Sequence, residues 1–93
     1  MIARLLDPPR AVPLLQGAET LYEVGLSGAP SSAWRVAFLR PPTRLVTARY
    51  SPEVGRVGLG GNAVHFRTTP DKLDAWLYRI DQWIAYANSV VED

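Results

Sequence analysis

The sequence predicts one α+β domain, a two-layer sandwich in which an antiparallel sheet packs against a long C-terminal helix and a short helix. Apolar residues recur at spacings of three and four near the end of the chain, and two upstream segments alternate apolar with polar residues. The length of 93 residues fits a single hydrophobic core. We expect the order β-α-β-β-β-α, with about three to five strands and an optional leading edge strand. Residues 1–18 are interpreted as an N-terminal extended segment or edge strand, and 19–93 as the domain.

The most distinct element is a helix starting near residue 70 and running to about Val90. Thr69 offers an N-cap hydroxyl, Pro70 suits the first helical position, and Asp71 and Asp74 place negative charge near the positive end of the helix dipole. An apolar stripe follows the helical period and is expected to be core. Its members are Leu73, Leu77, Ile80, Ile84, Ala87 and Val91, flanked by Trp76, Trp83 and Val90.

Segments 43–50 and 62–68 alternate apolar and polar residues and are predicted to be strands. Residues 56–59 form a short strand between them, and Gly60-Gly61-Asn62 suits a tight hairpin because these residues tolerate positive φ. The three segments therefore predict an antiparallel meander. Residues 20–27 form a further strand, whose inward side chains are expected to be Tyr22, Val24 and Leu26.

Two shorter segments complete the predicted fold. Pro30-Ser31-Ser32 is typical of a capped helix start, and two prolines at 41 and 42 stop the short helix. Its apolar residues are Trp34, Ala37 and Phe38. Residues 1–6 are predicted to pair as an edge strand, after which prolines 8, 9 and 13 favour an extended, irregular path.

Alternation along the predicted meander places basic residues on one face of the sheet. The side chains expected to face the helices are Val46, Ala48, Tyr50, Val57, Leu59, Val64 and Phe66. Those expected on the opposite, open face are Thr47, Arg49, Arg56, His65 and Arg67. Clustered guanidinium groups suit phosphate or carboxylate recognition because each donates paired hydrogen bonds. Alternatively, these side chains are solvated and partly neutralised by Glu23 or Glu53.

The chain is also electrically polarised. Residues 35–67 hold six arginines against the single acid Glu53, whereas residues 71–93 hold five acids against two basic residues. A GC-rich genome would produce the same preference for arginine. The charge pattern therefore leaves two interpretations open, a binding surface and a bias of composition.

The outer side of the long helix is a second candidate surface. Tyr78 and Ala85 lie opposite the apolar stripe, with Ala75 and Tyr86 nearby, so this side carries less charge than a solvated helix usually does. It could dock a partner helix or a second copy of the chain. Alternatively, these are isolated surface residues with good helix propensity.

The sequence offers few residues that could carry out catalysis or bind a cofactor. The chain has no cysteine, which removes thiolate metal sites, thiol nucleophiles and disulfides. Residues 58–63 match the pattern G-x-G-x-x-A of dinucleotide-binding proteins, but a strand follows where that motif needs a helix. His65 is the sole histidine, and no serine stands on a strand-to-helix elbow. We therefore expect no enzyme, no cofactor and no metal site.

Residues 1–6 are too short for the core of a signal peptide, and no apolar run approaches the ~20 residues needed to cross a bilayer. Together with the lack of cysteine, these features predict a cytoplasmic protein without membrane contact. The run 26–30, followed by Trp34 and Phe38, is similar to small accessory bacterial proteins, a similarity that assigns no role to any residue.

By elimination, the leading hypothesis is a small non-enzymatic module that binds another protein or forms a homodimer. A second hypothesis is weak nucleic-acid binding through an arginine-rich surface. The arginines concerned are Arg49, Arg56 and Arg67, joined by Arg35, Arg40 and Arg44. A third is a small-ligand carrier with an aromatic pocket between Trp34, Trp76 and Trp83.

Overall fold

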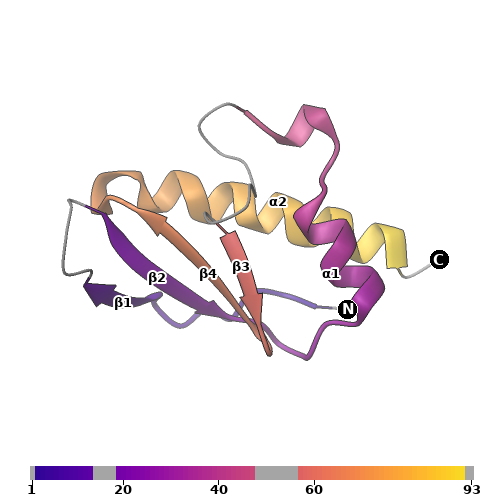
Figure 1. Ribbon diagram of the computed structural model, residues 1–93, viewed down its shortest axis with the longest axis horizontal. Helices are drawn as coiled ribbons and strands as arrows, with labels where there is room; N and C mark the ends of the chain where they lie inside the picture. Colours follow the sequence, from indigo (N-terminus) through magenta and orange to yellow (C-terminus); the bar gives the residue numbers. More distant parts are fainter. Residues whose placement is uncertain (1, 14–18, 48–56, 92–93) are drawn as a thin grey trace.

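A computed structural model describes residues 2–13, 19–47 and 57–91 of the chain. A sheet forms one layer and two α-helices form the other. Helix α2 runs along the sheet, and α1 lies beside the C-terminal half of α2 (Figure 1). In chain order the elements are β1 (Arg10–Pro13), β2 (Thr20–Gly25), α1 (Ser32–Leu39), the 3₁₀ turn η1 (Thr43–Leu45), β3 (Val57–Gly60), β4 (Ala63–Thr68), the 3₁₀ turn η2 (Pro70–Lys72) and α2 (Leu73–Val91). The predicted α+β sandwich is confirmed.

The sheet has the strand order β1-β2-β4-β3, and every neighbouring pair is antiparallel. Tyr22 and Val24 of β2 and Leu26 directly after it are buried as predicted, and so are Val64 and Phe66 of β4. Because Glu23 pairs with His65, the side chains between these buried positions share the opposite side of the sheet. One side of the sheet therefore faces the helices and the other does not.

The long C-terminal helix is confirmed, with a difference at each end. Val90 and Val91, expected in its buried stripe, are exposed in the last turn, where no other element covers them. Residues 70–72 form a 3₁₀ turn before α2, and Thr69 occupies the N-cap position of that turn. The Thr69 side chain makes no capping hydrogen bond; its backbone carbonyl accepts from the Lys72 N–H at 3.0 Å instead. The expected capping bond of the hydroxyl is therefore wrong, and α2 itself begins at Leu73, although helical structure starts at Pro70 as the sequence indicates.

A chain of aromatic rings joins the two layers through the core. The neighbouring pairs are Tyr22–Phe66, Phe66–Trp76, Trp76–Trp83, Trp83–Phe38 and Phe38–Trp34, with ring centroids 5.2–6.2 Å apart. Three of these contacts are stacked and two are edge-to-face. Both are geometries that aromatic pairs favour, so the rings hold β2, β4, α2 and α1 in one core.

The short helix α1 starts and ends as predicted. The Ser31 side chain caps it by accepting the Trp34 N–H at 3.2 Å, and Pro41 and Pro42 follow its last turn. Trp34 and Phe38 are buried, which is the face expected from the sequence. This helix therefore closes the core at the end of α2.

The predicted strand 43–50 is wrong over the residues that the structure describes. Residues 43–45 form the 3₁₀ turn η1, closed by hydrogen bonds from Leu45 N–H to Pro42 O and from Val46 N–H to Thr43 O. The buried Trp83 indole then donates to the Leu45 carbonyl at 2.8 Å. The turn therefore satisfies backbone groups that a strand would have used in a ladder, and Thr47 follows it exposed to solvent.

The hairpin between β3 and β4 is confirmed, with Gly60 opposite Ala63 and a two-residue turn between them. Gly61 has φ +59° and no heavy atom lies within 4 Å of where its Cβ would stand. A positive φ at the first central position is the sign pattern of a type II′ turn. A strand follows this turn, so the glycines serve a hairpin and not a phosphate-binding loop.

We expect Gly61→Ala to lower the stability of the domain by about 1–2 kcal/mol, because an L-residue is strained at positive φ. The space around Gly61 is open, so the loss would come from the backbone alone. Thermal unfolding monitored by circular dichroism would measure it. Gly58→Ala in β3 is the matched control, since its Cβ would meet nothing within 4 Å and its φ is not positive. Equal melting temperatures of both variants would contradict this account of the turn.

The leading edge strand lies later in the chain than predicted. The sequence places it at residues 1–6, but the structure shows β1 at Arg10–Pro13, within the stretch expected to be irregular. Near the start of the chain, Arg4 makes only an isolated antiparallel bridge with Leu26. Six positions separate Arg4 from Arg10, whereas only three separate their partners Leu26 and Glu23. The extra residues are taken up between the two pairings, next to prolines 8 and 9, which cannot donate to a ladder.

Candidate interaction surface

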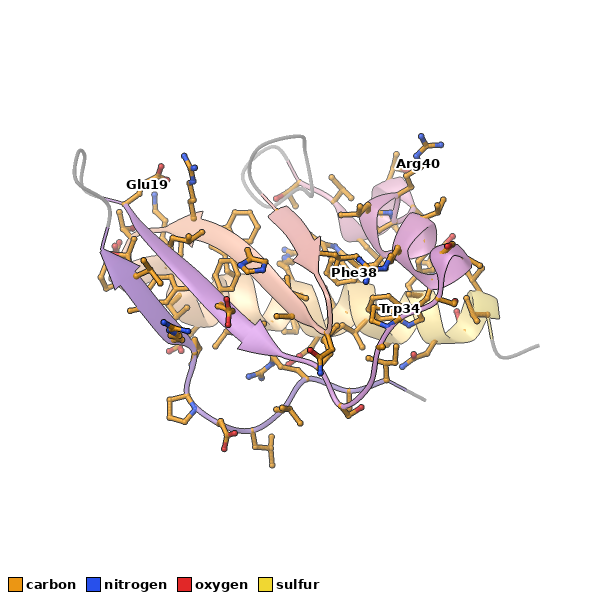
Figure 2. The ribbon with its side chains drawn as sticks, turned by 60° about the horizontal axis from the view of Figure 1, so that its bottom comes forward. Glu19, Trp34, Phe38 and Arg40 are labelled. Atoms are coloured by element: carbon orange, nitrogen blue, oxygen red, sulfur yellow. The ribbon has the colours of Figure 1, made fainter. Side chains whose placement is uncertain are left out.

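The side of the sheet that faces away from α1 and α2 is the candidate interaction surface, called here the open face. It is defined by cross-strand pairs that alternate with the buried positions. Its side chains are Arg10 and Val12 from β1, Leu21 and Glu23 from β2, and His65 and Arg67 from β4, beside Gly58 and Gly60 of β3. Figure 2 shows this side of the sheet turned toward the viewer, with α2 behind it.

A row of polar side chains crosses the middle of the open face. Arg10 lies opposite Glu23, which in turn lies opposite His65. The His65 Nδ1 atom is 3.5 Å from Glu23 Oε2, and each side chain is 35% exposed. The Glu23 carboxylate therefore lies beside the Nδ1 edge of the imidazole ring.

The Nε2 edge of the His65 ring lies against the backbone of β3 at Gly60. A Cβ atom at Gly60 would lie 2.9 Å from His65 Nε2, whereas one at Gly58 would meet nothing within 4 Å. The absence of a side chain at position 60 therefore lets the imidazole lie against β3. Within the described ranges, no three His, Cys, Asp or Glu side chains gather as a metal ion would require.

The structure describes only some of the residues predicted for the basic surface. His65 and Arg67 lie on the open face as expected, and Arg67 is exposed. Arg49 and Arg56 lie outside the described residues. Arg10 also lies on this face, although the sequence did not predict it there, because β1 was not expected at its position.

The other arginines of the polarised segment lie elsewhere. The Arg35 guanidinium donates to the Gly61 carbonyl at 2.9 Å, so it ties α1 to the hairpin turn. Arg40, at the end of α1, points away from the sheet (Figure 2) and is exposed, as is Arg44 in η1. The fold therefore does not gather these three arginines beside Arg67 on one surface.

The outer side of α2 is less available than its sequence suggests. Tyr78 is 58% exposed, and its hydroxyl accepts the Gln82 side-chain amide at 3.1 Å. The Arg79 guanidinium lies 5.9 Å from the centre of the Tyr78 ring. Ala75 and Ala85 are exposed, but Tyr86 is half-buried. Tyr78 therefore already has partners within the helix, and Tyr86 offers only part of its ring.

The three tryptophans proposed to surround a ligand are all part of the core. Trp34, Trp76 and Trp83 are at most 3% exposed. Their rings contact Phe38, Phe66 and one another, at the distances given above. These contacts account for the aromatic residues as packing and give the hypothesis of a ligand carrier no support.

Asn88 is a buried polar residue within the apolar stripe of α2 that was not among the predicted contact residues. Its Oδ1 accepts the Trp34 indole N–H at 2.9 Å and the Ile2 N–H at 3.2 Å, and its Nδ2 donates to the Ile2 carbonyl at 2.7 Å. A signal was present, because Asn88 follows Ile80 and Ile84 at intervals of four residues. A polar residue at a core position needs internal hydrogen-bond partners, so the sequence indicated a buried contact there.

No known protein family, curated protein or solved structure matches this chain. In the part of the chain that the structure describes, no helix has the length and apolar character needed to cross a membrane.

Proposed function

We propose that the protein is a small non-enzymatic, cytoplasmic interaction module that binds another protein through the open face of its sheet. The observation that carries this proposal is the exposure of a β1-β2-β4 surface on which apolar and charged side chains alternate in adjacent rows. Val12, Leu21 and Arg67 form one row, and Arg10, Glu23 and His65 form the next. Both α-helices pack on the opposite side of the sheet, so no described element covers this surface.

The composition of the open face suits a protein partner. Val12 is 37% exposed and Leu5, whose side chain lies over Gly25, is 41% exposed, so apolar area is present. Arginine is enriched in protein interfaces, and charges of both signs fix the orientation of a partner. The glycines of β3 allow a partner to approach the backbone closely.

The same composition favours a protein over a nucleic acid. Phosphate binding needs several cations that act together, whereas Glu23 lies between Arg10 and His65 in the middle of the open face. Binding to nucleic acid through Arg67 and the other arginines remains a prediction for the test below.

The test compares capture of partners from a lysate of the host by two charge-reversal variants. We expect Arg67→Glu to reduce binding of a captured and then purified partner by about tenfold or more, because it reverses the charge of an exposed side chain on the open face. Arg44→Glu is the matched control, since it makes the same change of charge on the exposed turn η1. It should leave affinity, measured by calorimetry, within about twofold of the parent.

Equal affinity of the parent and Arg67→Glu would contradict binding through the open face. Recovery of nucleic acid in place of protein, seen in the absorbance ratio of the captured material, would contradict a protein partner. A partner whose affinity falls for Arg44→Glu but not for Arg67→Glu would move the binding surface to η1.

A further inference from the structure

Residues 2–5, called here the strap, are held against the rest of the fold like a bound extended peptide. The strap follows the same edge of β2 as β1 does, further toward the C-terminal end of β2, and it also contacts Asp81 and Asn88 of α2. The residues that receive it are Gly25 and Ser27 at the end of β2, and Asp81 and Asn88 on α2. We call these four residues the strap seat.

The backbone of the strap is paired on both sides. On the β2 side, the Leu5 N–H donates to the Gly25 carbonyl at 2.9 Å, and the Ser27 N–H donates to the Ala3 carbonyl at 2.8 Å. The Ala3 N–H donates to Ser27 Oγ at 2.9 Å. On the α2 side, the Asn88 amide binds both the N–H and the carbonyl of Ile2. Addition of an extended segment to a sheet edge by such main-chain bonds is a recurring mode of peptide recognition.

Two side chains of the strap give the seat its selectivity. The Arg4 guanidinium donates to both oxygens of Asp81, with Nε–Oδ1 at 2.8 Å and Nη2–Oδ2 at 3.0 Å. The Leu5 side chain lies over Gly25, where a Cβ atom would come within 2.9 Å of Leu5 Cδ1. The seat therefore accepts a segment with arginine next to leucine, as in this chain.

A short connection joins the strap to β1. Leu6 is 94% exposed, and Asp7 and Pro8 are exposed as well. The connection bends at Leu6 and Asp7, and Pro8 and Pro9 after the bend have no N–H with which to pair to β2. The connection contains three residues more than a continuous strand would need between the two pairings. The strap and β1 therefore pair separately with this edge, and a conformational change at residues 6–9 can move one without the other.

We infer that the strap is exchangeable, and that two copies of this chain form a dimer in which each strap occupies the seat of the other. A foreign peptide is a poor competitor for the seat, because the strap is tethered to it and has a local concentration there in the millimolar range. Reciprocal exchange loses no contact, because each seat keeps an identical segment, and this is why domain swapping is a low-cost route to dimers. The inference does not rest on the proposed function, although Leu5 of the strap also supplies exposed apolar area beside the open face.

A disulfide placed between strap and seat would reveal the exchange in the full chain. Ala3 and Ser27 lie opposite one another in the strap bridge, and the chain has no other cysteine. We expect A3C/S27C, concentrated before oxidation, to form a covalent dimer whose fraction rises with protein concentration. Mixing ¹⁴N and ¹⁵N chains should give light–heavy linkages between residues 3 and 27 by peptide mass spectrometry. L21C/R67C is the control, because these residues pair between β2 and β4 and should link only within one chain.

A charge-swap pair tests the same inference without cysteine. Arg4→Asp and Asp81→Arg each place like charges between strap and seat when alone. When mixed, each strap matches the seat of the other variant, so mixed dimers should exceed either homodimer by about tenfold in native mass spectrometry. Only intrachain 3–27 disulfides at every concentration up to about 1 mM, together with no excess of mixed dimers, would overturn the exchange.

Discussion

Replacement of Trp83 by alanine is expected to unfold the domain or nearly so. The Trp83 side chain is fully buried, contacts the rings of Phe38 and Trp76 at their edges, and donates its indole N–H to the Leu45 carbonyl. Truncation of a buried tryptophan costs about 3–5 kcal/mol, against a total stability of about 5–15 kcal/mol for most domains. Urea unfolding followed by fluorescence and far-UV circular dichroism would measure the loss.

Two further variants separate packing from the general effect of removing an aromatic ring. Trp83→Phe keeps a ring but removes the hydrogen bond to Leu45, so its loss should be smaller than that of Trp83→Ala. Tyr78→Ala removes a ring that is 58% exposed on the same helix and should change stability by no more than about 0.5 kcal/mol. A cooperative melt of Trp83→Ala within a few degrees of the parent would show that the ring chain is not the core.

Helix α2, helix α1 and the β3–β4 hairpin were predictable because local and tertiary preferences agree in these segments. The stripe of α2 has the helical period over its whole length, Ser31 is a strong cap, and Gly61 suits the turn that follows β3. In β2 and β4 the alternation of apolar and polar residues matches the buried and exposed sides of the sheet. In such segments the residue pattern and the packing lead to the same structure.

The segment after Pro42 could not be predicted, because a tertiary contact overrides its alternating pattern. The decisive partner of Leu45 is the Trp83 indole, which lies 38 residues away in sequence. A 3₁₀ turn of three residues has no periodic signal long enough to detect. The misplacement of the edge strand has a similar origin, because the pairing of β1 with β2 carries no signal in the residues of β1 alone.

The open face was predicted in its central strand and missed at its edge. His65 and Arg67 follow from the period of β4, whereas Arg10 and Glu23 required the register of β1 and β2. The role of Arg4 was equally hidden, since its partner Asp81 lies 77 positions away. Ion pairs, and hydrogen bonds from side chains to the backbone of a distant segment, depend on the fold, so a single sequence does not reveal them.

Replacement of Asn88 by alanine is expected to lower stability by about 2–4 kcal/mol, the second-largest effect among these variants. The change leaves three groups without their partners, the Ile2 N–H, the Ile2 carbonyl and the Trp34 indole N–H. An unpartnered buried polar group costs about 1–3 kcal/mol, and water can replace part of the loss at Ile2, where the contact is only partly buried. Urea unfolding would give the free energy.

Hydrogen exchange distinguishes this account from a general weakening of α2. Asn88 connects the strap to the core, so Asn88→Ala should speed exchange most at the Ala3 and Leu5 amides, which bond Ser27 Oγ and the Gly25 carbonyl. Ser89→Ala is the matched control, because this neighbouring side chain is exposed and donates only to the Tyr86 carbonyl. It should leave stability and the exchange of the strap amides unchanged. A loss below about 0.5 kcal/mol for Asn88→Ala, or exchange raised equally over α2 and the strap, would show that Asn88 does not hold the strap in place.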